Sequence, residues 1–405
     1  PELATDYSLP LGDLLKQSPD LQTYHPTTVL ETGWDILFFW VARMILATTY
    51  ATGQVPFKTI YLHGLVRTED GKKMSKSHPE TIIDPLEIIP RYGTDALRFA
   101  VIQNTSPGND QRLGKTKIIA NRNFANKIWN VARYIEDIIG DNPERAGAKP
   151  TSAADHWILS KLQQSQEKIH GDLDNYHFGE AYDTLYHFIW DDLADWYIEA
   201  SKAEPNKPLL AYLLEQVLVL VHPFAPFLTE TIWQTLAWEK DSLLAARQSE
   251  KIIGHDGKRA AEFTEIQAIV SEARFITNAL KVAGATLYYT DVPFLKDNAA
   301  TIKHLARLQD VTEVTDGTGL FLTATRHKAW LDIDKSTAQS YAKELDAKRQ
   351  QQTASIQQLE SRMANKEYVK NAPKAVVGQT KDQLKAAQEL LATLDAEYQR
   401  FGNSN

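Results

Sequence analysis

Residues 341–405 carry a heptad repeat, which leaves this segment few ways to fold. Two interleaved apolar series recur every seven positions, Leu384, Leu391 and Tyr398 in one and Ala387, Leu394 and Phe401 in the other. Such a double series is the a/d seam along which one helix packs against another. A less regular apolar series precedes it, at Leu345, Ile356, Leu359 and Met363. Because Pro373 and Gly378 break the helix between the two series, we expect an antiparallel coiled coil over residues 336–405.

The charge of this segment is compatible with two functions. Residues 341–405 contain ten Lys and Arg against eight Asp and Glu, a net of +2, whereas the whole chain has a formal charge of −8. A coiled coil most often serves assembly. The local positive excess is also compatible with contact to RNA, because a global sum can hide a local field.

The rest of the chain is expected to form additional domains. The chain has 405 residues, more than the roughly 250–300 that one core usually holds, so we expect two or three domains. No apolar run reaches the roughly 18 residues of a membrane span, and the first residues do not form a signal peptide. The absence of cysteine excludes disulfides, thiolate zinc sites and a Cys nucleophile. We therefore expect no membrane partner and a cytoplasmic location.

The first 111 residues alternate between helical and extended patterns. Residues 1–30 hold four prolines and little periodicity, which indicates a chain that starts in the middle of a protein. Helical spacing from Gly33 to Tyr50 predicts a largely buried helix, and residues 59–64 predict a short strand that ends at a glycine. Asp84 and Pro85 are typical of a helix start, with the helix running to about Val101. We expect the second half of a Rossmann-like, doubly wound α/β domain over residues 1–111.

Long amphipathic runs dominate the sequence that follows. They predict a helical bundle over residues 112–275, and β-rich pieces around a short helix predict a small α+β region over residues 276–335. The fold class is therefore mainly α with an α/β part. The segment from Gln111 to Ile135 has six basic residues and no acidic one. Such a run forms either a solvated helix face or a surface for nucleic acid.

The segment Gly71-Lys72-Lys73-Met74-Ser75-Lys76-Ser77 follows the predicted strand and precedes Asp84. Taken alone it could be a basic loop, but in this position it resembles the KMSKS motif of class I aminoacyl-tRNA synthetases. The resemblance implies that Lys76 is the main ATP-contacting residue, that Lys73 is its partner, and that Met74, Ser75 and Ser77 complete the loop. Where the family usually continues with Lys or Leu followed by Gly-Asn, this chain has His78-Pro79-Glu80.

A second segment, Thr32 to Met44, reads Thr-Gly-Trp-Asp-Ile-Leu-Phe-Phe-Trp-Val-Ala-Arg-Met. It could be a plain buried helix, but it resembles valyl-tRNA synthetases over all thirteen positions. The resemblance implies that Gly33 lets the backbone approach the adenylate, that Asp35 meets the ribose hydroxyls and that Trp40 walls the valine pocket. His63 and Gly64 complete the ATP site that it implies.

Three further stretches resemble the same family, at residues 122–130, 155–162 and 222–230, as does the hinge at residues 365–377. The resemblance implies an anticodon-binding bundle and a coiled coil laid against the tRNA, in a monomer whose partners are tRNA(Val), valine and ATP with Mg²⁺. For His222 a structural role before Pro223 is favoured over catalysis. We expect tRNA contacts from basic residues at Arg112, Lys115, Lys117, Arg122, Lys366 and Lys370.

The His-x-Gly-His element of class I synthetases does not occur in these 405 residues. We therefore expect the complete protein, with the missing N-terminal half, to be a valine–tRNA ligase and this chain alone to be inactive. Two alternatives stay open, a non-catalytic RNA-binding module and a coiled-coil assembly protein. No prosthetic group and no protein-bound metal are expected.

Overall fold

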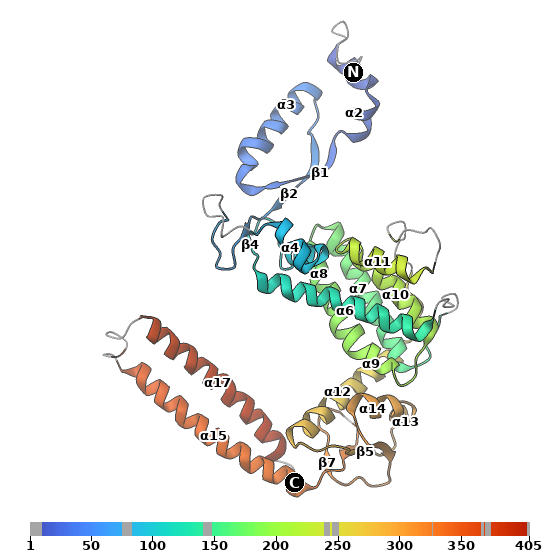
Figure 1. Ribbon diagram of the computed structural model, residues 1–405, viewed down its shortest axis with the longest axis vertical. Coiled ribbons are helices and arrows are strands. Elements are labelled where there is room, and N and C mark those ends of the chain that lie inside the picture. Colours follow the sequence, from blue (N-terminus) through green and yellow to red (C-terminus); the bar gives the residue numbers. More distant parts are fainter. Residues whose placement is uncertain are drawn as a thin grey trace. The chain divides into compact units, whose positions relative to one another are not determined.

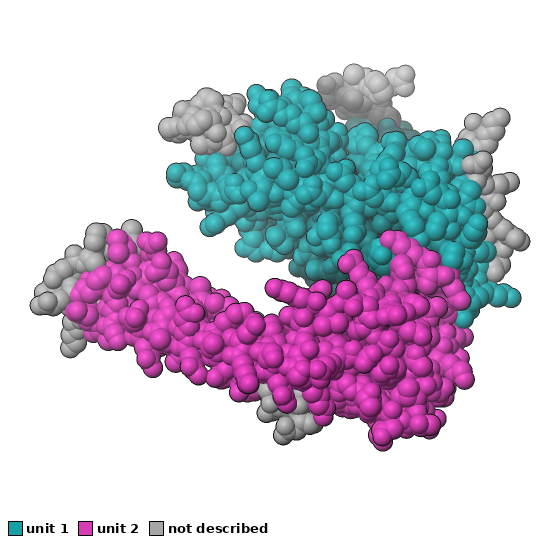
Figure 2. All heavy atoms as spheres, turned by 60° about the horizontal axis from the view of Figure 1, so that its bottom comes forward, with its two compact units in different colours: residues 1–151, 158–199, 205–256 teal, residues 152–157, 200–204, 257–405 magenta. Residues whose placement is uncertain are grey.

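The computed structural model describes residues 10–74, 83–140, 148–238, 244, 251–325, 327–365, 368 and 374–402. The chain divides into two compact units (Figure 2), one formed by residues 1–151, 158–199 and 205–256 and the other by residues 152–157, 200–204 and 257–405. Helices predominate and the sheets are small, so the fold is mainly α with an α/β part, as predicted. Within the described ranges, no helix has both the length and the apolar character needed to cross a membrane.

The first unit begins with a β-α-β arrangement (Figure 1). Strands β1 (Thr27–Gly33) and β2 (Phe57–His63) are parallel, and their register runs from Thr27 opposite Phe57 to Gly33 opposite His63. Parallel strands need a crossover connection, which is helical here. The preceding and connecting helices are α1 (Leu11–Gln17), α2 (Pro19–Tyr24), η2 (Trp34–Ile36), η3 (Leu37–Val41) and α3 (Ala42–Thr52). The predicted strand at residues 59–64 is confirmed as part of β2.

The prediction that residues Gly33 to Tyr50 form a largely buried helix is wrong, because most of the large side chains are exposed. Only Val41 is buried between residues 34 and 52, whereas Phe38 is 77% and Tyr50 is 94% exposed. The helix is also divided into the short 3₁₀ turn η2, the π-helical turn η3 and the regular helix α3. Helical spacing reveals which apolar residues share a face, but not what covers that face. The described residues leave most of the large apolar side chains of this segment exposed.

A second parallel pair, β3 (Val66–Arg67) and β4 (Gln111–Arg112), brackets helices α4 (Pro85–Tyr92) and α5 (Thr94–Ile102). The predicted start is confirmed, because the Asp84 side chain accepts a hydrogen bond from the Leu86 N–H and Pro85 opens the helix. The single predicted helix to Val101 is two helices. Gly93 separates them with φ +92°, a backbone conformation that suits glycine and ends the helical path.

Long helices build the rest of the first unit and the start of the second, as predicted for a helical region. They are α6 (Lys115–Ile139), α7 (Ala153–Asp174), α8 (Phe178–His187), η5 (Phe188–Tyr197), α9 (Ile198–Ser201), α10 (Lys207–Val221), α11 (Pro226–Leu236) and α12 (Gly257–Ala279). The rings of Phe99, Phe124 and Tyr182 meet in the core, with centroids 5.3–6.1 Å apart. The Tyr182 hydroxyl lies 2.5 Å from the Asn121 Oδ1, and burial raises the pKa of Tyr182. These contacts join α5, α6 and α8.

The second unit contains a four-stranded sheet and a helical hairpin. The sheet has the order β6-β5-β8-β7 and consists of β5 (Thr286–Tyr289), β6 (Asp310–Glu313), β7 (Leu320–Phe321) and β8 (Ala329–Leu331). Helices α13 (Pro293–Asp297) and α14 (Ala299–Ala306) connect β5 to β6. This is the small α+β region that the sequence predicted.

The hairpin consists of α15 (Lys335–Ala364) and α17 (Lys374–Gly402). Their contacts run in opposite directions along the two helices, since the Arg349 Nε lies 2.5 Å from the Asp395 Oδ1 and Tyr368 bonds to Thr380 at 2.8 Å. The antiparallel coiled coil is therefore confirmed. Phe401, from the second heptad series, is only 1% exposed. Gly378 was predicted to help break the helix, which is wrong, because it lies within α17. Pro373, the other predicted breaker, lies outside the described residues.

Candidate functional site

The carboxyl ends of β1 and β2 bring three of the predicted site residues together. Gly33 and His63 are opposite each other in the register. A Cβ atom at Gly33 would lie 2.7 Å from the Asp35 Oδ1 and 3.6 Å from the His63 Cε1. Gly33 has an ordinary φ of −71°, so the space around it, and not its backbone conformation, disfavours a side chain. Gly33 is buried, and the Asp35 carboxylate and the His63 imidazole occupy the space that a side chain at this position would need.

His63 has a defined orientation at this edge. Its Nδ1 lies 3.0 Å from the Gly64 carbonyl oxygen, which can only accept, so the Nδ1 carries a hydrogen. In the neutral imidazole the Nε2 is then an acceptor. The Nε2 lies 3.7 Å from the Glu31 carboxylate; the Glu31 side chain is largely exposed and that of His63 is partly exposed. An exposed pair of this kind contributes little stability.

Gly64 has a structural reason to be glycine. A Cβ atom there would lie 1.7 Å from the Asn109 carbonyl oxygen, because the segment after α5 crosses directly over this point. The Gly108 N–H donates to the Leu62 carbonyl oxygen at 2.7 Å in the same crossing. Gly64 therefore permits the contact between β2 and the 105–110 segment.

Asp110 is a central residue that the sequence analysis did not single out. Its carboxylate accepts hydrogen bonds from the Leu65 N–H at 2.8 Å and from the Arg67 Nε at 2.5 Å, and it is also bonded to the Trp34 side chain. The Leu65 N–H, followed by Arg67, lowers the pKa of Asp110. Asp110 thus connects β3 to the turn that follows Gly33. The only local signal for it is the Pro-Gly-Asn-Asp turn sequence at residues 107–110.

The start of the predicted ATP loop is attached to this network. Lys73 forms an antiparallel bridge with Arg67, across a turn in which the Thr68 N–H donates to the Lys72 carbonyl oxygen at 2.9 Å. Lys72 pairs with Asp70 at 2.8 Å, and together with the Thr68 hydroxyl it lowers the pKa of Asp70 to about 2. Within the described residues Lys73 has no ion pair. Its charge is therefore available to an anion.

Met74 is described, but Ser75, Lys76 and Ser77 lie outside the described residues, as does the departure at residues 78–80. A chain of contacts nevertheless leads from the base of the loop to the strand edge, from Lys73 through Arg67 and Asp110 to Trp34.

A cavity of about 570 Å³ lies beside His63. It is lined by the end of β2, by α5 and by the turn after α10, including Tyr61, Arg98 and Phe224. Trp40, the predicted wall of the amino-acid pocket, does not line this cavity and is 50% exposed.

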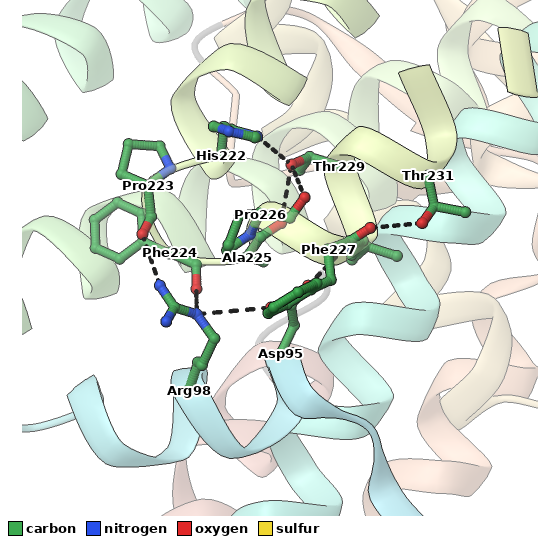
Figure 3. Close-up of polar contacts among 11 residues, drawn as sticks. Asp95, Arg98, His222, Pro223, Phe224, Ala225, Pro226, Phe227, Thr229 and Thr231 are labelled. Carbon is green, nitrogen blue, oxygen red and sulfur yellow. Dashed lines mark hydrogen bonds and ion pairs between the residues drawn. The ribbon is translucent and has the colours of Figure 1, made fainter. Parts of the chain in front are cut away.

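Two residues of α5 hold the turn that lines this cavity (Figure 3). The Leu228 N–H, in the first turn of α11, donates to the Asp95 Oδ2 at 2.6 Å. Arg98 donates from its Nε to the Phe224 carbonyl oxygen at 3.0 Å and from an Nη to the Pro223 carbonyl oxygen at 3.2 Å. His222 lies outside these contacts, with its Nδ1 2.8 Å from the Thr229 Oγ1, which is a structural position. Burial is the main cause that raises the pKa of Asp95.

The basic residues that were predicted to contact tRNA differ in their exposure and in their hydrogen-bond partners. Arg112 is exposed, and its guanidinium lies 3.4 Å from the place of a Cβ on Gly71. Lys115 is exposed at the start of α6. Lys117 is half-buried and donates to the Gln103 carbonyl oxygen at 2.6 Å, and burial lowers its pKa. Arg122 is partly buried beside Asn123.

Lys366 and Lys370 lie outside the described residues. In the described part of the chain, no group of three or more His, Cys, Asp and Glu side chains is arranged to hold a metal ion.

Comparison with known proteins identifies three consecutive matches. Residues 9–114 match the family described as tRNA synthetases class I (I, L, M and V). Residues 155–288 match the anticodon-binding domain of tRNA ligase, and residues 332–402 match the valyl tRNA synthetase tRNA binding arm.

Curated relatives match most or part of the chain. A valine–tRNA ligase of Dehalococcoides mccartyi strain ATCC BAA-2266 is 34% identical over 94% of this chain and 46% of its own length. A valine–tRNA ligase of Geobacillus kaustophilus is 45% identical over 57% of this chain and 27% of its own. The chain thus spans about half the length of the curated relatives it matches along most of its sequence.

Among solved structures, the ternary complex of Agrobacterium radiobacter K84 agnB2 LeuRS-tRNA-LeuAMS covers 66% of this chain and 30% of its own. The sequence identity is 18% and the TM-score is 0.47.

Proposed function

Because the chain belongs to the class I tRNA synthetases and has the domain order of the valine–tRNA ligases, we propose that it is part of an enzyme that activates valine with ATP and transfers it to tRNA(Val). In this proposal the chain supplies the second half of the catalytic domain, an anticodon-binding bundle and a tRNA-binding arm. The observation that carries the proposal is the succession of three family matches along one chain, together with the strand edge at Gly33, Asp35 and His63.

The strand edge has the geometry that nucleotide binding requires. In open parallel sheets, ligands bind beyond the carboxyl ends of the strands, which is where Gly33 and His63 lie. Because Gly33 has no side chain, the Asp35 carboxylate and the His63 imidazole come together at this edge. The exposed Asp35 carboxylate beside it is an acceptor for ribose hydroxyl groups.

In the activation step the lysines stabilise negative charge on the phosphates. The valine carboxylate attacks the α-phosphorus of ATP, an oxygen–phosphorus bond forms, and the bond to pyrophosphate breaks. Negative charge develops on the phosphate oxygens, so the protein acts through position and charge. Lys73, with no carboxylate partner among the described residues, is suited to this role. A preorganised donor of this type lowers a barrier by about 3–4 kcal/mol.

Lys76 is proposed as the second ammonium group from the sequence motif alone. Mg²⁺ enters with ATP and needs no protein cage of its own. Asp110 and Arg67 are positioning residues, since they hold the start of the loop against the turn after Gly33.

The transfer step needs the other two parts of the chain. The bundle and the hairpin would bind tRNA through exposed basic residues such as Arg112 and Lys115. Lys117 is a weak candidate, because it is bound to the Gln103 carbonyl oxygen.

Two measurements test this proposal. The 405-residue chain should bind a tRNA(Val) transcript with an affinity that falls steeply as salt rises. It should catalyse no valine-dependent ATP–pyrophosphate exchange by itself, since these residues lack a His-x-Gly-His element. Exchange should start when a polypeptide with the first half of the catalytic domain is added, and Lys73→Ala should reduce it at least tenfold, with Lys58→Ala as the control. Absence of tRNA binding would refute the proposal.

The alternative is a non-catalytic tRNA-binding module. It predicts the same salt-dependent binding, but no exchange in the reconstituted protein. Lys73 has no carboxylate partner among the described residues, and its turn is connected through Arg67 and Asp110 to Trp34, next to Gly33. This arrangement favours the enzyme, because an RNA-binding module has no need of it.

A further inference from the structure

The first turn of helix α8 reaches the strand edge by two routes. The Phe178 ring packs directly on the Tyr61 ring of β2, with centroids 5.4 Å apart and planes at 62°. The next residue, Gly179, is buried, and a Cβ atom there would lie 2.2 Å from the Thr105 carbonyl oxygen. A side chain at this position would therefore displace the Thr105 backbone, which belongs to the segment that follows α5.

Thr105 has little freedom to move by itself. Its N–H and its hydroxyl both donate to the Ile102 carbonyl oxygen, at 3.1 Å and 2.7 Å, so Thr105 is held at the end of α5. The Asn109 N–H donates to the Ser106 carbonyl oxygen at 3.1 Å, and the Asn109 side chain donates to the Ser106 hydroxyl at 2.9 Å. These bonds make the 105–110 segment a compact unit. Because packed structure is nearly incompressible, a displacement at one end of the segment is passed to the other.

The far end of the 105–110 segment is attached to the predicted ATP site. The Asn109 carbonyl oxygen lies directly over Gly64, and the Leu65 N–H donates to the Asp110 Oδ1 at 2.8 Å. Asp110 also joins Arg67, at the base of the predicted ATP loop, to the turn that follows β1. The segment therefore lies between α8 on one side and the base of the ATP loop on the other.

We propose that Gly179 positions the base of the ATP loop, acting through the 105–110 segment and Asp110. Gly179 is a positioning residue, because its effect on the reaction is exerted by Lys73 and not by a contact of its own with substrate. The inference rests on the proposed function and adds a residue to it. The match over residues 155–288 describes an anticodon-binding domain, and the proposal gives the start of α8, within that range, a second role at the site of activation.

The first test measures valine-dependent ATP–pyrophosphate exchange in the protein reconstituted with the first half of the catalytic domain. Gly179→Ala should lower kcat about 10- to 100-fold, because a displacement of about 1 Å at a reacting group has an effect of this size. The KM for valine and the affinity for a tRNA(Val) transcript should not change, since the variant leaves their binding residues in place.

Gly171→Ala is the matched control. It makes the same substitution near the end of helix α7, where a Cβ atom would have no described atom within 4 Å. Alanine is ordinarily preferred to glycine inside a helix, so this variant should keep full activity and stability. A loss confined to Gly179→Ala therefore reports the contact with Thr105 and not the change of residue type.

A double substitution tests whether Gly179 acts through Asp110. Asp110→Asn should itself lower kcat, because it weakens the acceptor for the Leu65 N–H and Arg67. Adding Gly179→Ala to this variant should cause little further loss, since residues that act through one another are not additive. Hydrogen exchange on the 405-residue chain gives a readout without activity. The Leu65 amide should exchange about tenfold faster in Gly179→Ala and at an unchanged rate in the α7 control.

Phe178→Leu is the milder variant, for use if Gly179→Ala does not fold. It keeps an apolar side chain but removes the ring contact with Tyr61, and it should lower kcat severalfold with KM unchanged. If the folded variants keep the kcat of the unaltered protein, the inference is wrong and the proposed function stands. A lower kcat with unchanged Leu65 exchange, or losses that multiply in the double variant, would also overturn it, because the effect would not pass through Asp110. If the unaltered reconstituted protein catalyses no exchange, the proposed function fails and takes this inference with it.

Discussion

Replacing Asp95 tests the connection between α5 and the start of α11. The Asp95 side chain is 6% exposed and accepts the Leu228 N–H at 2.6 Å in the first turn of α11 (Figure 3). Asp95→Ala removes the acceptor that caps this helix, at a cost of about 0.5–2 kcal/mol. The same change leaves a partly buried N–H without a partner, which costs about 1–3 kcal/mol. Because the two figures describe one hydrogen bond, we expect a loss of about 2 kcal/mol.

Hydrogen exchange of the α11 amides measures this loss directly, since local opening sets their exchange rates. A loss of about 2 kcal/mol corresponds to roughly 30-fold faster exchange. Asp95→Asn keeps an oxygen for the Leu228 N–H and removes a buried charge, so exchange should stay within about threefold of the unaltered chain. Equal exchange in the Ala and Asn variants, or no change in either, would refute this reasoning.

The pH dependence provides a second test on the same residue. Burial raises the pKa of Asp95, so between the ordinary carboxyl pKa and the raised one the folded chain holds a proton that the unfolded chain has lost. Stability therefore falls as pH rises through this window. The stability of Asp95→Asn relative to the unaltered chain should rise across the window and become constant above it. A difference that does not vary with pH would contradict the raised pKa.

Three further substitutions follow from the geometry. Gly33→Ala should displace the Asp35 carboxylate, because its Oδ1 lies 2.7 Å from the position of the new Cβ. Thermal unfolding should stay unchanged, whereas calorimetry should reveal binding of a valyl-adenylate analogue to the reconstituted protein that is weaker by up to about 100-fold. The pKa of Asp110 is lowered in the folded chain, so its carboxylate contributes stability that is lost as pH falls through the lowered pKa. The difference in melting temperature between the unaltered chain and Asp110→Asn should therefore shrink on acidification below about pH 4. Phe401→Ala removes a ring that is 1% exposed and 5.2 Å from that of Tyr341, and chemical unfolding followed by circular dichroism should reveal a loss of about 3–5 kcal/mol. A loss below about 1 kcal/mol would mean that the base of the hairpin is not packed as described.

Local patterns predicted the elements correctly wherever the determining groups are close along the chain. The cap at Asp84 acts two residues further on, at the Leu86 N–H, and Pro85 sets its own backbone angle. The heptad series predicted the hairpin for the same reason, because the seam is repeated within each helix. Gly33 and His63 were predicted from motifs, and the parallel register placed them opposite each other. These features depend on residue type and spacing, which can be read directly from the sequence.

Tertiary contacts decided the features that depend on residues far apart in the chain. The Leu65 N–H reaches Asp110 across 45 positions, and the Leu228 N–H reaches Asp95 across 133. No periodicity encodes such pairs, because each partner is ordinary in its own neighbourhood. The same limit explains the exposed Phe38 and the half-buried Lys117. Spacing assigns a side chain to a helix face, but only the packed chain determines whether that face meets a neighbouring element or water.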